Sequence, residues 1–315
     1  MPRFPKPPMA RYLGPIIDAH MHLRTAAETR LFVEMAEAYG VRTFLGNGDL
    51  SFVADCRREF PGQFHGLVRL QYDRINDDED FQRYAIGLLN QAVREEDIRG
   101  VKFWFKPMFN ATSGLFWDDR RLDIVFDFLA EHRLVALVHI ADPDVWWRHT
   151  YRDTARYGTK AETYRQLVNR LRRHRGVTVQ AAHLGGDPEH LNHLDRLLDE
   201  HANLYLDLSA TKWLARELSR KPDESRQFVV RRADRLLWGS DLVVARQQNM
   251  DFDDYATRYY VHRHLWEGRG PLLSPIPDDD ADGPVTVQGL DLPPDVLEKI
   301  YRLNAERLYR IRADH

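Results

Sequence analysis

The sequence has almost no cysteine: Cys56 is the only one in 315 residues. One thiol cannot form a disulfide within the chain, and a zinc cluster built from several cysteines is excluded. Cys56, in the segment FVADCRREF, is therefore expected to be a small apolar residue packed on a helix. Histidine, in contrast, is abundant, with 14 copies.

Long hydrophobic runs are also missing. No apolar stretch reaches the length of a membrane span, and the proline-rich N-terminus MPRFPKPPMARYLGP has no apolar core of the signal-peptide type. A cytoplasmic location without membrane contact is therefore expected. No charge of one sign dominates either, because 45 lysines and arginines face 48 aspartates and glutamates. This balance disfavours a nucleic-acid binder, which usually has a strongly basic domain.

Eight short apolar runs recur along the chain and are predicted to be strands, each buried on both faces of a parallel sheet. Segments with helical periodicity lie between them, including residues 27–40, 119–133, 160–174 and 188–201. Strands that alternate with helices form βαβ units, and eight of them favour a closed barrel. The predicted strands are residues 16–22, 41–47, 63–70, 100–104, 134–140, 177–183, 203–209 and 235–241.

The predicted fold is thus α/β, a single (β/α)₈ TIM barrel over residues 1–315. An open doubly wound sheet is the alternative, and the lack of a glycine-rich turn after the first predicted strand disfavours it. Residues 242–292 break the rhythm and are predicted to be a long loop insertion, which is usually functional or disordered. His262 and His264 in it are expected at the surface or the pocket rim. Residues 293–311 are predicted to form a closing helix.

Two histidines end the first predicted strand, in the segment DAHMHL. Residues two apart in a strand point to the same side, so His20 and His22 are expected to converge. Paired imidazoles suit a divalent cation, although an isolated His-x-His is more often two unrelated polar residues. The carboxyl end of a barrel strand favours the metal, because barrel active sites lie at that face.

Three later strands end in similar residues. His139 closes LVALVHIAD, His183 closes TVQAAHLGG and Asp241 closes DRLLWGSDL. A buried imidazole or carboxylate without a partner is costly, so several at one rim favour a shared use. This nitrogen–oxygen set is suited to Zn²⁺, with Mn²⁺ or Fe²⁺ as alternatives.

Four segments resemble the metal-site motifs of the amidohydrolase superfamily: DAHMHL, LVHIAD, AAHLGG and LLWGSD. They are most similar to its second large family, amidohydrolase family 2, which contains metal-dependent hydrolases, lactonases and non-oxidative decarboxylases. The resemblance covers nearly the whole chain, including the closing NAERL of residues 304–308. It implies a (β/α)₈ barrel with one divalent metal, and it places His183 beside the metal-bound water or the substrate. The ligands it implies are His20, His22, His139 and Asp241.

The sequence departs from close relatives after Asp241. Many lactonase and decarboxylase members resemble one another in an aromatic residue and a proline at this point, and here Leu242-Val-Val follows. Neither specific activity is therefore assigned by the motif.

Binuclear members that resemble this fold use a carboxylated lysine at the end of the fourth strand, where this chain reads GVKFWFKP. Lys102 resembles the recurrent Gly-Val-Lys of the family and is expected to pair with a carboxylate such as Asp18, so one metal is favoured. Lys102 is also a candidate substrate-binding residue. The other candidates are Trp104, Trp146, Arg216 and Arg246, the last two because a guanidinium binds a carboxylate through two hydrogen bonds.

The function predicted first is hydrolysis of a C–O or C–N bond in a small carbonyl-bearing molecule, such as a lactone, ester or amide. A metal lowers the pKa of bound water towards ~7, Asp241 takes the proton, and His183 orients the water or stabilises negative charge. Non-oxidative decarboxylation of an aromatic or unsaturated acid is the alternative, and a non-catalytic metal-binding barrel is a remote one. The expected partners are a small-molecule substrate and a second copy of the chain in a homodimer.

Overall fold

Parallel strands form the centre of the molecule, as the apolar runs predict. The computed structural model describes residues 1–313. In the nine-stranded sheet the order is β8-β7-β6-β5-β4-β3-β2-β1-β9, so consecutive strands are neighbours. The strands are β1 Ile16–His22, β2 Val41–Gly48, β3 Phe64–Arg69, β4 Gly100–Trp104, β5 Val135–His139, β6 Val179–Ala181, β7 Leu204–Asp207, β8 Leu236–Leu237 and β9 Leu242–Val243.

The sheet closes on itself between its first and last strands. Strand β9, which follows β8 after four residues, pairs in parallel with β1. The four residues between β8 and β9 also bond to β1: the Ala19 N–H donates to the Trp238 carbonyl (3.0 Å), and the Asp241 N–H donates to the His20 carbonyl (2.7 Å). A Cβ at Gly239 would lie 2.9 Å from the Cβ of His20, so only glycine allows this close approach. The TIM barrel is thereby confirmed.

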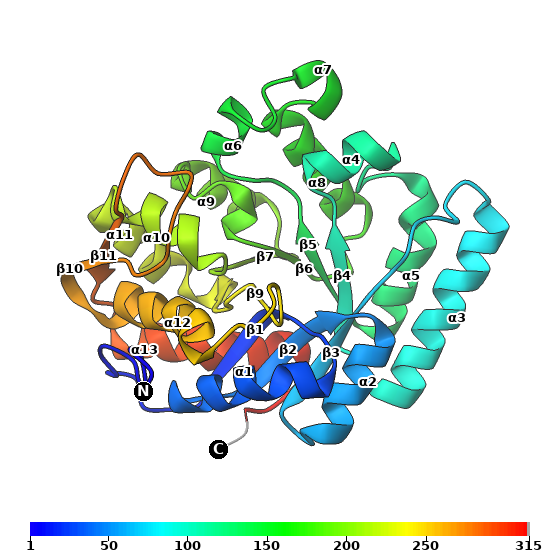
Figure 1. Cartoon of the computed structure of the whole chain (residues 1–315). Helices are drawn as coiled ribbons and strands as arrows, with labels where there is room; N and C mark the ends of the chain where they lie inside the picture. Colours follow the sequence, from blue (N-terminus) through cyan, green and yellow to red (C-terminus); the bar gives the residue numbers. More distant parts are fainter. Residues whose placement is uncertain (314–315) are drawn as a thin grey trace.

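Helices surround the strands on the outside (Figure 1). Each of the two helices α1 and α8 begins with a capping box, in which a threonine and a glutamate bind each other's backbone N–H groups. Within residues 1–313 no helix is long and apolar enough to cross a bilayer. The α-helices that precede β8 are α1 Ala26–Ala38, α2 Leu50–Glu59, α3 Asp78–Glu96, α4 Pro107–Ser113, α5 Asp123–His132, α6 Asp144–Arg148, α7 Thr154–Tyr157, α8 Lys160–Arg173, α9 Leu191–Glu200, α10 Thr211–Ser219 and α11 Pro222–Arg232.

The predicted loop insertion over residues 242–292 is mostly regular structure, and this correction has a physical cause. It contains helix α12 (Phe252–Glu267) and an antiparallel hairpin of β10 (Arg269–Leu273) and β11 (Thr286–Leu290). Helix α12 is buried around much of its circumference, so its sequence lacks a one-sided apolar stripe. Its buried charges satisfy each other in the Arg263–Glu267 ion pair. His262 and His264, expected at the surface or rim, are also buried.

The predicted closing helix is confirmed, with one wide turn in it. It runs through α13 (Pro294–Glu298), a π-helical turn over Lys299–Leu303 and α14 (Asn304–Tyr309). Within the wide turn, the Ile300 carbonyl accepts from the Trp238 N–H (2.8 Å). Behind it, Tyr309 reaches into the barrel and donates from its hydroxyl to the Gln180 side chain (2.6 Å). The closing segment therefore fixes the last strand and fills the end of the barrel opposite the predicted site.

Asp18 joins three elements at the seam of the barrel. Its buried carboxylate accepts hydrogen bonds from the Ser240 backbone N–H (3.0 Å), the Ser240 hydroxyl (2.6 Å) and the Tyr259 hydroxyl of α12 (2.7 Å). Burial raises the pKa of Asp18 to about 6, against the lowering effect of these hydrogen bonds. Strand β1, the turn after β8 and helix α12 thus share one acceptor.

We expect Asp18→Ala to lower the free energy of unfolding by roughly 2–4 kcal/mol, because the Ser240 and Tyr259 hydroxyls would lose their buried acceptor. Chemical denaturation at pH 7 measures this change. The exposed carboxylate of Asp73 provides the control, and Asp73→Ala should change the free energy by less than about 0.5 kcal/mol. Equal effects of the two substitutions would contradict the role of Asp18.

The buried imidazole of His262 predicts a pH dependence. Its Nδ1 accepts from the Trp238 indole N–H (2.7 Å), and burial lowers its pKa to about 3. Below its unfolded-state pKa of about 6.5, the unfolded chain gains a proton that the folded chain refuses, so falling pH favours unfolding. Between pH 6.5 and 4, wild type should lose up to about 1.4 kcal/mol per pH unit relative to His262→Gln. The free energy of unfolding of both proteins is measured by denaturation at pH 7, 6 and 5. A difference between wild type and His262→Gln that does not change with pH would contradict this role of His262.

Candidate active site

Two histidines and a carboxylate converge at the carboxyl end of the barrel. The Nε2 atom of His22 lies 2.9 Å from Asp241 Oδ1, and the Nε2 atom of His20 lies 3.3 Å from the same oxygen. Their ligand atoms all lie within 4.8 Å of one another. Two imidazole nitrogens and a carboxylate oxygen are a donor set that divalent transition metals prefer, so the residues fit such an ion.

His183 and Asp241 both have left-handed backbone conformations, with φ of 60° and 57°. Residues other than glycine rarely adopt this region, and where they do it often marks a functional site. The turn it introduces ends strand β6 two residues before His183, which explains why the strand is shorter than predicted. His183 Nε2 then lies 3.8 Å from Asp241 Oδ2. The structure therefore brings His20, His22, His183 and Asp241 together.

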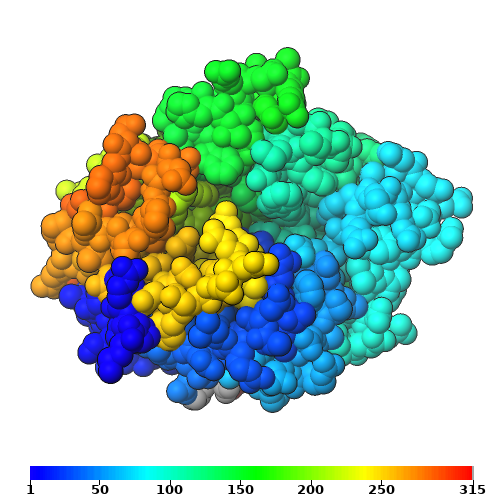
Figure 2. Space-filling model, viewed as in Figure 1, coloured from blue at the N-terminus to red at the C-terminus, as the bar shows by residue number. Residues whose placement is uncertain are grey.

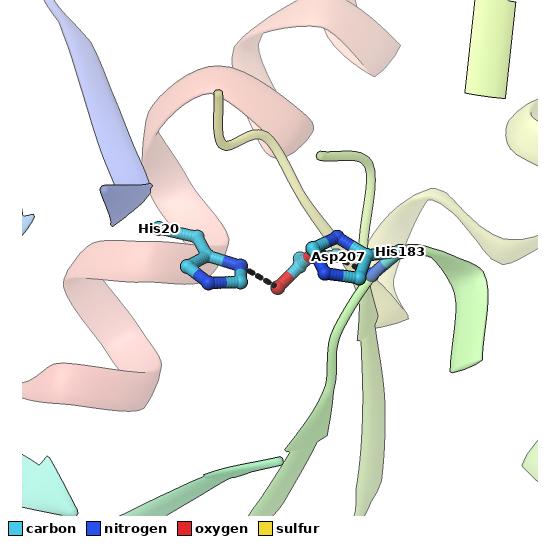
Figure 3. A group of neighbouring side chains, drawn as sticks. All are labelled: His20, His183 and Asp207. Carbon is cyan, nitrogen blue, oxygen red and sulfur yellow. Dashed lines mark hydrogen bonds and ion pairs between the residues drawn. The ribbon is translucent and has the colours of Figure 1, made fainter. Parts of the chain in front are cut away.

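Asp207, the last residue of β7, and Ser209, two residues later, hold two of these histidines from behind. Figure 3 shows Asp207 bonded to His20 and next to His183. His20 Nδ1 lies 3.0 Å from Asp207 Oδ2, and His183 Nδ1 lies 2.7 Å from the Ser209 hydroxyl. Ser209 gives its one proton to Asp207, so His183 Nδ1 must be the donor to Ser209. His20 Nδ1 likewise donates to the Asp207 carboxylate. Each ring therefore keeps a proton on Nδ1 and directs its Nε2 towards Asp241.

Asp207 and Ser209 were not predicted as site residues, although both are polar residues at the end of the apolar run of a predicted strand, as His139 and His183 are. Asp207 also accepts from the backbone N–H of His183 (2.8 Å) and from the Gln180 side chain (2.7 Å). Burial acts to raise the pKa of Asp207, but His20, His183 and Ser209 outweigh it and hold the pKa below its usual value. Asp207 is therefore a fixed negative charge under the site.

Burial and neighbouring charges also determine the pKa values of Asp241, His183 and His22. Burial acts to raise the pKa of Asp241, but the three neighbouring histidines outweigh it, and the pKa lies well below its usual value. Burial lowers the pKa of His183 to about 3 and that of His22 to about 4. Near neutral pH the site therefore combines an ionised Asp241 with neutral rings at His22 and His183, and a neutral imidazole and an ionised carboxylate are the forms that bind a metal.

His139 lies at the same cavity but faces another partner. Its Nε2 is 2.9 Å from Asp142 Oδ1, and its ring packs edge-on against His183 with centroids 4.9 Å apart. Asp142 is also held by the Tyr151 hydroxyl (2.7 Å). His139 stays a predicted ligand, although in this structure its Nε2 is bonded to Asp142.

The expected pairing of Lys102 with Asp18 is wrong. Lys102 Nζ lies 2.8 Å from His20 Nε2, whereas Asp18 is occupied by Ser240 and Tyr259. The two side chains belong to different surroundings because Asp18 points to the barrel seam and Lys102 to the barrel interior. Burial lowers the pKa of Lys102 to about 8.

A cavity of about 500 Å³ opens above these residues. Figure 2 shows this face hollowed between the teal segment around α4, the green segment around α6 and the yellow segment after β9. Two of the predicted substrate-binding residues, Trp146 and Arg246, line the cavity, and so does Trp213. Lys106 and Arg258 line it as well and were not predicted.

Two other predicted substrate-binding residues have different surroundings. Trp104 is 47% exposed, with the Lys106 ammonium 4.6 Å from its ring centroid. Arg216 is buried in ion pairs with Glu217 and with Asp278 of the β10–β11 loop. Its guanidinium therefore fastens this loop to α10, and neither residue belongs to the cavity lining.

The acidic loop between β10 and β11 lies over the cavity. Besides Arg216, it is held by Lys212, which is 3.4 Å from Asp278 and 3.5 Å from Asp280. The Trp146 indole N–H donates to Asp280 (3.2 Å). The loop thus joins α10 to α6 across one side of the opening.

Comparison with known proteins identifies the family. The family model described as amidohydrolase matches residues 17–311. The chain belongs to the amidohydrolase family. It is a metal-dependent enzyme of that superfamily, as the four motifs predict. No curated protein sequence matches the chain at a significant level.

Solved structures share the fold of this amidohydrolase at low sequence identity. The 5-carboxyvanillate decarboxylase of Novosphingobium aromaticivorans, solved with manganese and a nitrobenzoic acid, is 14% identical, with a TM-score of 0.60 over 99% of this chain and 100% of that chain. The corresponding decarboxylase of Sphingomonas paucimobilis is 14% identical, with a TM-score of 0.55 over 95% and 100%. The 4-oxalomesaconate hydratase of Rhodopseudomonas palustris is 15% identical, with a TM-score of 0.53 over 94% and 95%.

We expect His22→Ala to remove stoichiometric metal, because a ligand is lost. Asp207→Asn should weaken metal affinity by roughly 10- to 100-fold, because the amide no longer fixes the protonation of His20 Nδ1. Metal content after dialysis against a chelator measures both. Asp223→Asn, at an exposed position on α11, is the matched control. Full metal content in His22→Ala would show that the ligand assignment is wrong.

Proposed function

We propose that this amidohydrolase hydrolyses a C–O or C–N bond beside a carbonyl group in a small molecule. The observation that carries the proposal is the ionised Asp241 carboxylate, in contact with two imidazoles and beside a third. An ionised carboxylate at a metal site accepts a proton from an attacking water, which is the first requirement of hydrolysis.

We assign the metal to His20, His22 and Asp241, with His139 as the fourth ligand. A divalent ion held there lowers the pKa of a water towards ~7 and polarises the substrate carbonyl. Zn²⁺ is the ion that we propose, since neutral imidazoles and one carboxylate suit it. The manganese in the N. aromaticivorans decarboxylase makes Mn²⁺ the first alternative.

In this proposal Asp241 transfers the proton and His183 orients the attacking water. Asp241 takes the proton of the attacking water and passes it to the leaving group. His183 keeps Nδ1–H on Ser209 and offers Nε2 to the cavity, so it orients the water through an accepted hydrogen bond. Trp213 packs edge-on against the His183 ring, with centroids 5.3 Å apart, and holds it in place.

Non-oxidative decarboxylation is the second candidate. The two decarboxylases among the similar structures support it. In this reaction Asp241 would first take a proton from a bound water or from the substrate and then give it to the carbon from which carbon dioxide leaves. The same residues serve both reactions, so the products discriminate between them.

We expect His183→Asn to keep the metal and to lose turnover by roughly 10²–10⁴-fold, the range for a general acid–base or electrostatic group. Asp241→Asn should lower both metal content and turnover. Turnover is assayed with panels of lactones, amides and aromatic acids. Incorporation of ¹⁸O from labelled water into the product reports hydrolysis, and release of carbon dioxide reports decarboxylation. Carbon dioxide release without ¹⁸O incorporation would show that the enzyme is a decarboxylase and that the proposed hydrolysis is wrong. A metal-free His183→Asn protein would make His183 a ligand.

A further inference from the structure

Three cations line the cavity without a carboxylate partner. Among residues 1–313, Lys106, Arg246 and Arg258 form no ion pair within 4.0 Å, whereas the fourth lining cation, Lys212, is paired with the acidic loop. Lys106 lies over the rings of Trp104 and Trp146 at the opposite side of the barrel from the other two. Of the three unpaired cations, Arg246 and Arg258 therefore lie on the same side of the cavity and carry like charges.

Arg246 and Arg258 both line the cavity that contains Asp241. Arg246 is exposed on the segment after β9, and Arg258 is half-buried on α12. Burial lowers the pKa of Arg258 and the positive charge of Arg246 lowers it further, whereas the negative charge of Asp254 acts against both effects without reversing them. The one hydrogen bond from the Arg258 guanidinium within residues 1–313 goes to the neighbouring Thr257 hydroxyl (3.2 Å). Most of its N–H groups therefore remain free for a ligand.

The fold holds this pair in position at a cost in stability. Tyr259, the residue after Arg258, is buried and bound to Asp18, so the backbone that carries Arg258 is fixed. Asp254 lies on the same wall, but it accepts from the Asp251 N–H (2.8 Å) as the helix cap. Other arginines with little exposure in this molecule, such as Arg170 and Arg263, bind carboxylates. Two adjacent guanidiniums without one repel each other, and a bound anion would remove that repulsion.

We propose that Arg246 and Arg258 form an anion subsite for a carboxylate of the substrate. The inference rests on the proposed function, because it places the reacting carbonyl at Asp241 and the carboxylate on the α12 wall. The substrate class is then a small carboxylic acid with a second, reactive carbonyl group. Guanidiniums match a planar carboxylate through paired hydrogen bonds, so both arginines contribute.

Glutarate is a suitable probe, because its two carboxylates represent the substrate anion and the reacting group. Its binding to the metal-loaded protein is measured by calorimetry for wild type, Arg246→Gln and Arg258→Gln. Dimethyl glutarate is the neutral probe and inorganic phosphate the competing oxyanion. Arg83→Gln, at an exposed and unpaired arginine on α3, is the matched control. Metal content and thermal unfolding are measured on the same samples.

Each cavity arginine variant should bind glutarate roughly 10- to 100-fold more weakly than wild type, since a charge-assisted hydrogen-bond pair is lost. Arg83→Gln should bind it like wild type. Dimethyl glutarate binding should not depend on the arginines. The cavity variants should unfold at the same temperature as wild type or a higher one, because one of two like charges is gone.

Equal glutarate affinity in all four proteins, or no binding by wild type below about 10 mM, would overturn the subsite. Phosphate that binds more tightly than glutarate and depends on the same arginines would overturn the carboxylate assignment. His22→Ala separates the two proposals: its glutarate binding should still depend on Arg258. If that variant keeps its metal, the metal assignment of the proposed function fails while the arginine comparison stands.

Discussion

The site depends on how the barrel is closed. Eight strands can bring their ends together only if the last one pairs with the first, and here that seam is short, with two residues in β8 and two in β9. Asp18 strengthens it by accepting from Ser240 and Tyr259, and Gly239 allows the two backbones to approach. This closure places Asp241 against His20 and His22, which lie more than two hundred residues earlier in the chain.

A second set of hydrogen bonds decides the chemistry of that site. Asp207 and Ser209 determine which nitrogen of His20 and of His183 carries the proton, and both rings offer Nε2 upward as a result. Because the rings of His22 and His183 are neutral near pH 7, these two neighbours do not supply a full positive charge to balance Asp241. In the proposed site a divalent cation would supply the missing positive charge next to this carboxylate.

The mouth of the cavity divides its charges into two groups. Lys212 and Arg216 are neutralised by the acidic loop between β10 and β11, so they act as fasteners of that loop. Among residues 1–313, Arg246 on the segment after β9 and Arg258 on α12 form no ion pair, and the hydrogen bond from Tyr259 to Asp18 fixes the backbone of α12 next to Arg258. The paired cations thus fix the wall of the cavity, and the anion subsite proposed above uses the two arginines that the loop does not neutralise.

The sequence by itself determined the barrel, the family and the strand ends that carry His20, His22, His139, His183 and Asp241. Apolar runs and polar residues that directly follow them are local features, so they can be read from neighbouring positions. Only the tertiary structure decided that Asp18 serves the seam, that Lys102 faces His20, that Arg216 fastens a loop and that α12 is a buried helix. Those outcomes depend on which distant groups become neighbours when the barrel closes, and a charged or aromatic side chain carries no local mark of the partner that will satisfy it.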